Sequence, residues 1–230
     1  MNSLGKDILG VLLLVVCSCS FSAGVSYDSS DFQRVSDIID DVVLDIRYYS
    51  SNNFIGKKIR GYGAPIAYLI KRAVEALAKA ADSLRKQGYR LLIWDAYRPQ
   101  KAVSHFLEWI DDPNDPGDKS FYPNLEKSDL IADGYIAPKS GHSRGSTIDL
   151  TIVGKDGSFV DMGGSFDLFD ARSNRNYEGL TGIQRTNRKI LENAMTEAGF
   201  VGANSEWWHY TYKDEEYKDT HFDFDVRYNL

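Results

Sequence analysis

Two short stretches of the sequence carry side chains that bind transition metals. The first contains His142 and Asp149, and the second contains Glu206 and His209. Two imidazoles and one carboxylate are a common ligand set for a catalytic zinc ion, whose fourth position stays open for water. The remaining carboxylate is then free to take a proton from that water. Together the four residues predict a hydrolytic zinc site with Glu206 as its general base.

The first pair depends on how the chain enters a strand. Residues 146–153 alternate between apolar and polar side chains, and Asp149 lies on the polar face of this predicted strand. His142 stands seven residues earlier, an odd separation that places it on the opposite face of an unbroken strand. Gly141 and Gly145 allow a sharp loop that returns His142 over Asp149. The other interpretation is a surface loop followed by an exposed aspartate.

The second pair also needs a break in the strand. Residues three apart in an ideal strand face opposite sides, so Glu206 and His209 share one site only if a bend or a strand start separates them. The intervening Trp207 and Trp208 are large enough to be buried on both sides and to hold such a geometry. The other interpretation is an aromatic edge strand with a surface histidine.

Arg98 is the third chemical element. It follows a predicted buried strand over residues 90–94 and precedes Pro99, which is well placed to open a helix. A guanidinium held there by the scaffold can stabilise an oxyanion or bind a carboxylate through two nitrogens. The alternative is a salt bridge to Asp95.

The elements that must position these residues alternate irregularly along the chain. No consecutive strand–helix–strand units are visible, which favours a single α+β domain with a largely antiparallel central sheet flanked by helices. The long polar segment over residues 111–139 also carries aromatic residues, so we expect a packed lid rather than a loose loop. The predicted strands are 42–48, 90–94, 146–153 and 206–212, and the predicted helices are 65–87, 99–110 and 183–198.

Length and charge set limits on the function. The 230 residues suit one domain with a sizeable core. The net charge of −6 argues against nucleic acid or an anionic membrane as a partner. No obligate protein partner is inferred from the sequence.

The N-terminus has the layout of a secretory signal. Residues 8–16 form a short apolar run followed by small residues, which predicts a cleaved leader over residues 1–22 and a catalytic domain over residues 23–230. Lipidation at Cys19 is the alternative, and it would anchor the protein to a membrane without changing its chemistry. Cys17 and Cys19 both lie in the leader, so the predicted mature chain has no thiolate. Imidazole and carboxylate must therefore hold any metal.

These motifs resemble the D-alanyl-D-alanine dipeptidase family, whose zinc dipeptidases include relatives of the vancomycin-resistance dipeptidases. The family is related more distantly to D,D-carboxypeptidases and hedgehog-type domains, and the resemblance implies that fold. It extends from about Ser36 to Val226. The motifs that carry it are Asp45 to Gly56, Asp95 to Pro99, Ser140 to Thr151, Met162 to Asp167 and Glu206 to Tyr210.

The resemblance also implies one zinc ion per chain and a role for each motif residue. It implies that His142, Asp149 and His209 bind zinc and that Glu206 is the general base. It implies that Arg98 stabilises the transition state. It also implies that Asp167, with Ser140, recognises the substrate ammonium and that Tyr48 lines the pocket.

The activity that the resemblance implies is hydrolysis of D-alanyl-D-alanine to two molecules of D-alanine. With the predicted leader, this indicates a periplasmic enzyme of cell-wall turnover or D-alanine scavenging. A D,D- or L,D-carboxypeptidase acting on peptidoglycan stem peptides is the alternative enzyme. The alternative of another class is a non-catalytic, zinc-bearing wall-binding domain.

Overall fold

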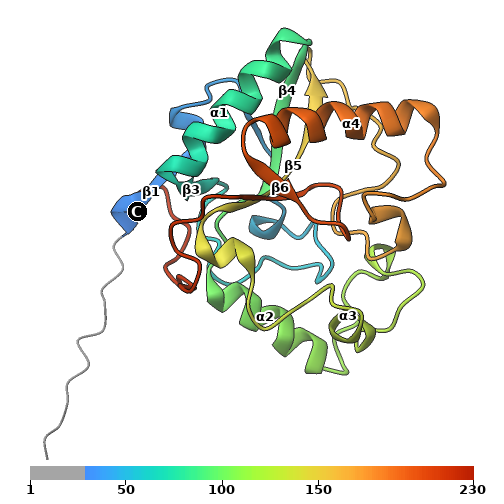
Figure 1. Ribbon diagram of the computed structural model, residues 1–230. Helices are drawn as coiled ribbons and strands as arrows, with labels where there is room; N and C mark the ends of the chain where they lie inside the picture. The colour runs from blue at the N-terminus through green and yellow to red at the C-terminus, as the bar shows by residue number, and fades with distance from the viewer. Residues whose placement is uncertain (1–28) are drawn as a thin grey trace, which may run out of the picture.

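The computed structural model describes residues 29–230, and a five-stranded sheet forms its centre (Figure 1). Its strands lie in the order β2, β4, β5, β7, β6, and β2 runs parallel to β4 while the other neighbours are antiparallel. The sheet is therefore largely antiparallel, as predicted. Its strands are β2 (Val43–Leu44), β4 (Tyr89–Asp95), β5 (Thr147–Gly154), β6 (Phe200–Gly202) and β7 (His209–Tyr212).

A second, two-stranded sheet lies near the N-terminal end of the described chain. β1 (Phe32–Arg34) pairs antiparallel with β3 (Tyr68–Ile70). The amide of Ile70 donates a hydrogen bond to the Gly145 carbonyl at 2.8 Å. This small sheet therefore supports the loop that carries the first metal motif.

Two long helices cover one face of the central sheet. α1 (Lys71–Lys86) and α4 (Gly182–Glu197) pack against each other, α1 also against β4 and α4 also against β6 (Figure 1). α1 buries an apolar stripe at helical spacing. α4 begins with a capping box, in which the side chains of Thr181 and Gln184 each accept a hydrogen bond from the other's amide.

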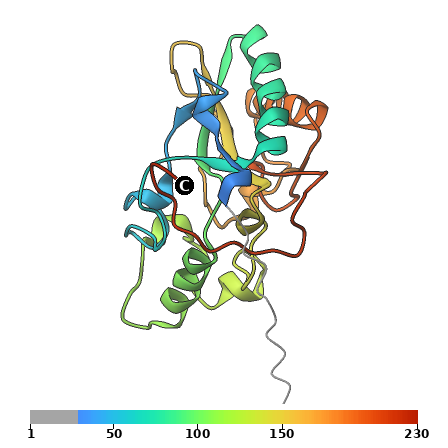
Figure 2. The same ribbon diagram turned by 90° about the vertical axis from the view of Figure 1, so that its left-hand side faces the viewer.

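Two further helices lie at the end of the molecule away from α1 and α4 (Figures 1 and 2). They are α2 (Gln100–Asp111) and the short α3 (Asp129–Ala132). Phe106 and Trp109 of α2 pack around Phe54, with ring centroids 5.0 and 5.3 Å from its own. This aromatic cluster supports the sheet face opposite to α1 and α4.

The segment over residues 111–139 is packed rather than loose, as predicted. It contains α3 and a short 3-10 helix, η4 (Lys119–Phe121). Phe121 and Tyr122 are buried in the core, and Tyr135 packs its ring on Phe169 with centroids 5.3 Å apart.

Two element boundaries outside the metal motifs differ by several residues from the prediction. The helix expected from residue 65 begins at Lys71, because residues 68–70 pair with β1 as a strand. The strand expected over residues 42–48 is only two residues long, and a 3-10 helix, η3 (Arg47–Tyr49), ends it. The start of α1 is therefore set by strand pairing with β1, and the end of β2 by the 3-10 helix that follows it.

No helix within residues 29–230 has the length and hydropathy needed to cross a membrane. The leader predicted over residues 1–22, with the alternative lipidation site Cys19, lies outside the described residues. Both therefore stay predictions.

Candidate active site

Asp149 lies in the middle of the sheet, and both faces of its strand are buried. Ile148 and Leu150 are inaccessible on one face, and Thr147, Asp149 and Thr151 are at most 2% exposed on the other. The alternation predicted for this strand is present, but its polar face is not a solvent face. The interpretation of Asp149 as an exposed aspartate is therefore wrong, and a carboxylate buried this deeply requires partners.

The partners come from the neighbouring strands at the same level. Asp149 pairs in register with Asp95 at the end of β4 and with His209 at the start of β7. Residues directly opposite each other in antiparallel strands point to the same side of the sheet. A register shift between Ile93 and Asp95 turns the end of β4. Three adjacent strands thereby contribute side chains to one face.

A short 3-10 helix returns His142 to this face. In η5 (Gly141–Arg144) the Ser140 side chain acts as the N-terminal cap, accepting a hydrogen bond from the His142 amide at 3.3 Å. Gly145 ends the helix with a φ of +79°, and a Cβ there would lie 2.5 Å from the Phe32 ring. Glycine is thus required both conformationally and sterically. The prediction that a glycine-bearing loop returns His142 is confirmed.

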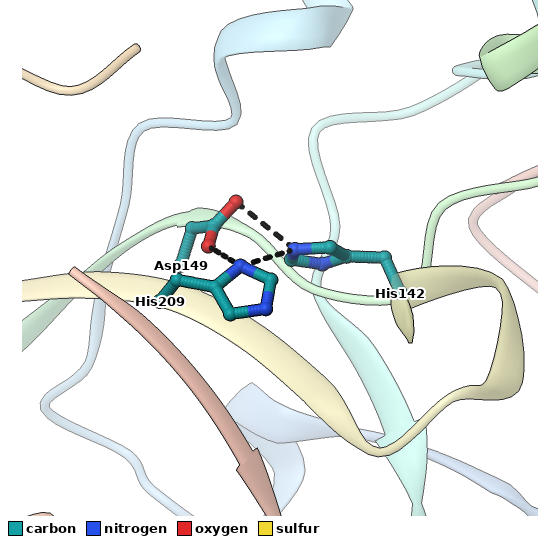
Figure 3. Close-up of side chains that lie close together, drawn as sticks. All are labelled: His142, Asp149 and His209. Atoms are coloured by element: carbon teal, nitrogen blue, oxygen red, sulfur yellow. Dashed lines mark hydrogen bonds and ion pairs between the residues drawn. The ribbon is translucent and has the colours of Figure 1, made fainter. Parts of the chain in front are cut away.

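Three ligand atoms converge on this face (Figure 3). His142 Nε2 lies 3.1 Å from Asp149 Oδ2, and His209 Nδ1 lies 3.0 Å from Asp149 Oδ1. The two ring nitrogens are 3.3 Å apart, and all three ligand atoms lie within 4.8 Å of one another. Atoms at these separations can surround one metal ion. The structure therefore brings together the three residues predicted as metal ligands.

This donor set fits a zinc ion. His142 Nδ1 donates a hydrogen bond to the Ala96 carbonyl at 2.8 Å, which leaves the lone pair of a neutral His142 at Nε2, facing Asp149. A lone pair and a carboxylate oxygen repel each other at 3.1 Å unless a cation lies between them. Asp149 Oδ1 also receives no hydrogen bond within residues 29–230. Two imidazoles and one carboxylate are typical of a catalytic zinc site.

The surroundings keep Asp149 ionised. Burial alone raises the pKa of its carboxyl, but the adjacent imidazoles of His142 and His209 outweigh burial. The net effect holds the pKa of Asp149 below its usual range. A metal ion binds the ionised form, so the ligand is ready without a prior loss of a proton.

Glu206 lies in the turn that leads into β7. The His209 amide donates a hydrogen bond to the Glu206 carbonyl at 3.3 Å, so a turn rather than a strand relates the two residues. The strand expected over residues 206–212 therefore begins only at His209, which removes the parity conflict. Trp207 and Trp208 are both buried, as predicted.

The Glu206 carboxylate borders the ligand cluster. Its Oε2 lies 3.5 Å from His209 Nδ1, and its side chain is 18% exposed. Burial raises the pKa of Glu206 to about 7, although the charge of His209 acts in the opposite direction. A carboxyl group that titrates near neutrality can both accept and return a proton.

Arg98 connects the strands at the cluster. Its Nε donates to Asp95 Oδ2 at 2.9 Å, and its Nη2 lies 3.5 Å from Asp149 Oδ2. The guanidinium also lies over the rings of Tyr48 and Phe106, at 5.0 and 5.4 Å from their centroids. Burial lowers the pKa of Arg98, but Tyr48, Asp95 and Asp149 more than offset burial and raise it. The salt bridge to Asp95 is present, and it orients the guanidinium toward the cluster.

Asp167 is a further buried carboxyl beside the cluster. Its φ of +55° lies in the left-handed region, which aspartate enters more readily than most residues other than glycine. Tyr48 donates a hydrogen bond from its hydroxyl to Asp167 Oδ2 at 2.8 Å. Burial and, after it, the charge of Asp149 raise the pKa of Asp167 well above its usual value. A bound cation would relieve both effects.

A supporting layer of polar residues was not signalled by the sequence. Tyr62 donates to Asp95 Oδ1 at 2.6 Å, while Asp95 Oδ2 binds Arg98 and lies 3.5 Å from His142 Nδ1. One buried carboxylate thereby orients two functional side chains. The sequence marks Asp95 only as a salt-bridge partner of Arg98, and no motif surrounds Tyr62.

Two imidazoles and a carboxylate on a buried sheet face, with a glutamate and an arginine beside them, define the site of a metallohydrolase. The chain belongs to the peptidase M15 family of D-ala-D-ala dipeptidases, whose family model matches residues 28–227. It is therefore a zinc metallopeptidase. The predicted family, the fold class and zinc as the cofactor are confirmed.

Curated relatives agree with this family. A D-alanyl-D-alanine dipeptidase of Enterococcus faecium is 40% identical over 198 residues, covering 85% of this chain and 98% of the relative. The enzyme of that name from Streptomyces coelicolor is 38% identical over 86% of this chain and 99% of its own. The one from Escherichia coli is 33% identical over 80% of this chain and 85% of its own.

Proposed function

We propose that this protein hydrolyses D-alanyl-D-alanine to two molecules of D-alanine. The observation that carries the proposal is the convergence of His142, Asp149 and His209, with Glu206 and Arg98 at its edge. The relatives named D-alanyl-D-alanine dipeptidases match over almost their whole length, which supports the same substrate.

In this proposal each residue at the edge of the cluster has a step of the hydrolysis. His142, Asp149 and His209 would hold the zinc ion, which would supply a positive charge and lower the pKa of a water. Glu206 is placed to accept a proton from the attacking water and to return it to the leaving amine. Arg98, held in place by Asp95, stabilises the oxyanion that develops on the substrate carbonyl.

Asp167 gives the site its preference for a free dipeptide. The buried carboxyl needs a cation, and the ammonium of a dipeptide lies one residue from the bond to be cut. A stem peptide carries a neutral amide at that position, so it leaves Asp167 unpaired. Tyr48 orients the carboxyl through its hydrogen bond. Ser140, whose hydroxyl keeps a lone pair beyond its bond to the His142 amide, is the second contact for the ammonium.

Release of D-alanine from D-alanyl-D-alanine tests the proposal. A chelator should abolish the release and added zinc should restore it. Glu206→Gln should keep one zinc per chain but lose about 10²–10⁴-fold in kcat. Glu197→Gln, the same change at an exposed residue of α4, serves as the control. Near-normal turnover by zinc-loaded Glu206→Gln would contradict the mechanism.

The choice of substrate decides between this function and its rivals. The dipeptidase proposal fails if the protein cuts a pentapeptide stem and leaves the free dipeptide intact, which is the result expected of a carboxypeptidase. Binding of peptidoglycan without product from either substrate would instead indicate a non-catalytic wall-binding domain.

We also propose that the protein is exported to the periplasm and takes part in cell-wall turnover or D-alanine scavenging. The apolar run over residues 8–16 and the small residues after it support export. Cell fractionation tests the location. Recovery in the membrane fraction, lost in Cys19→Ala, would indicate a lipid anchor, whereas recovery in the cytoplasm would contradict export.

A further inference from the structure

A cavity of about 390 Å³ lies on the same side of the sheet as the metal cluster but does not include it. Trp94 and Thr151 line it from β4 and β5, and Gly164 and Phe166 line it from the loop that follows β5. Trp207 completes the wall. None of the predicted metal ligands, nor Glu206, Arg98 or Asp167, is among its lining residues.

Three aromatic rings shape this cavity. Trp94 and Phe166 are stacked, with centroids 5.2 Å apart and planes at 26°. Trp207 meets Trp94 edge to face at 5.8 Å. Rings in this arrangement present flat apolar walls, and cavities of this size that are lined by aromatic side chains are typical of small-molecule sites.

Two buried polar atoms in the walls have no partner. Thr151 Oγ1 and Trp207 Nε1 make no hydrogen bond within residues 29–230, although their residues are only 2% and 1% exposed. Buried polar atoms in native proteins are almost always paired, with protein, water or ligand. A Cβ built on Gly164 would lie 3.8 Å from Trp207 Nε1, so a larger side chain at residue 164 would occupy space beside this nitrogen.

The rim of the cavity offers guanidinium nitrogens that can donate hydrogen bonds. Arg47 donates from Nε to Asp45 at 2.7 Å, and Arg172 donates from Nε to Asp170 at 3.0 Å. No terminal nitrogen of either guanidinium makes a hydrogen bond within the described part of the chain. The Arg47 guanidinium also lies 5.8 Å from the centroid of the Trp94 ring. Both side chains can therefore receive an anion above the aromatic walls.

The acidic residue at the rim is already engaged. Asp161 accepts hydrogen bonds from the Gly163 amide at 2.9 Å and from the Gln184 side chain at 3.0 Å. Asp45 and Asp170 already form ion pairs with the two guanidiniums, so the rim offers free donor nitrogens rather than a net positive charge. The lining combines a flat apolar interior, unpaired polar atoms and these free guanidinium nitrogens.

We propose that this cavity is a second binding site, for a small carboxylate with a flat apolar body. The body packs against the aromatic wall that Trp94, Phe166 and Trp207 form, and the carboxylate lies at Arg47 and Arg172. Trp207 directly follows Glu206 in the sequence, so the occupant packs against the turn that positions the general base.

Calorimetric titration of the zinc-loaded protein with phenylacetate tests the proposal. Phenethylamine carries the same ring with a cation, and acetate carries the carboxylate without the ring. We expect phenylacetate to bind at least tenfold more tightly than either. Equal binding of acetate would indicate a carboxylate on the zinc, and equal binding of phenethylamine would indicate an apolar contact only. Either result, or no binding of phenylacetate, overturns the proposal.

Variants of the lining locate the bound phenylacetate. Gly164→Val, which fills the space beside Trp207, should abolish binding, while Gly182→Val, whose Cβ meets open space, should leave it unchanged. Arg172→Gln changes an exposed side chain and should weaken binding at least threefold with the fold intact. Full affinity in both Gly164→Val and Arg172→Gln would place the ligand elsewhere and refute the proposal. Because binding is measured without turnover, the result is independent of the proposed dipeptidase activity.

Discussion

The two faces of β5 are equally buried, yet their chemistry is opposite. On the face under α1 and α4, Ile148 and Leu150 have no exposed surface and present only carbon to their neighbours. On the other face, Asp149 and Thr151 are within 2% of complete burial and present polar atoms. Burial alone therefore does not distinguish a face that stabilises the fold from a face that carries a functional site. The two faces differ in whether they contain buried polar atoms without hydrogen-bond partners.

The polar face keeps atoms that a face built only for packing would lack. Asp149 Oδ1 and Thr151 Oγ1 have no hydrogen bond within residues 29–230, and the same holds for Trp207 Nε1 and Trp208 Nε1. Each such atom costs free energy unless a ligand or water satisfies it. Local departures of this kind are expected where a fold holds a site. The metal cluster lies at Asp149, and the second cavity lies at Thr151.

The largest difference between the faces should appear when the ligand carboxylate loses its charge. Asp149→Asn keeps the volume but removes the anion between two imidazoles. Loss of a residue that merely orients a ligand lowers metal affinity about 10–100-fold. Loss of the ligand itself should exceed about 100-fold, with activity falling in parallel and the circular dichroism of the metal-free protein unchanged. Zinc titration measures the effect, and an unchanged affinity would contradict the assigned ligand.

The neighbouring residue on the apolar face should behave in the opposite way. Leu150→Ala removes fully buried carbon and should lower the free energy of unfolding by about 2–5 kcal/mol. The folded fraction should still bind one zinc. Urea denaturation of the metal-free protein measures the change, with Ile183→Ala, at a 72% exposed residue, as a control expected within about 0.5 kcal/mol. Loss of zinc by folded Leu150→Ala would contradict the claim that the apolar face stabilises the fold without holding the metal.

The sequence predicted much of this contrast because alternation in β5 is local. The period of two, the glycines around His142 and the motif residues are all visible without neighbours. The burial of the polar face was not predictable, because it depends on tertiary packing by segments other than β5 itself. The turn before His209 was not predicted either, because the local pattern placed Glu206 and His209 in one strand. Only the hydrogen bond from the His209 amide to the Glu206 carbonyl shows the turn.

The support of the site was the least predictable part. Tyr62 reaches Asp95 across 33 residues of sequence, and nothing near Tyr62 indicates a functional contact. The bounds of β3 also depended on a partner strand remote in sequence. Local patterns thus predict which residues do chemistry, while long-range contacts decide how those residues are held.

Tyr62→Phe should weaken the functional face without touching a ligand. The substitution removes the 2.6 Å hydrogen bond to Asp95, which orients both Arg98 and His142. A hydrogen bond to a charged group contributes about 1.5–3 kcal/mol. We expect part of this loss to raise the activation free energy, so kcat should fall about tenfold with a smaller change in KM. Steady-state kinetics on D-alanyl-D-alanine measure this. Tyr68→Phe removes a buried hydroxyl bonded to the Arg227 carbonyl and should leave kcat unchanged. Equal losses in both variants would show that Tyr62 only stabilises the fold.

The smallest effect compares two threonines on the same face of β5. Thr147 Oγ1 lies 3.0 Å from Thr211 Oγ1 in a hydrogen bond, whereas Thr151 Oγ1 has no partner. Thr147→Val should therefore cost about 1 kcal/mol, because it also leaves Thr211 unpaired. Thr151→Val should cost nothing or stabilise by up to about 1 kcal/mol, since it replaces an unsatisfied hydroxyl with a methyl group. Thermal unfolding of the metal-free variants gives the order. If Thr151→Val were the more destabilising of the two, the Thr151 hydroxyl would have a hydrogen-bond partner in solution. The polar face would then contain fewer unsatisfied atoms than the structure indicates.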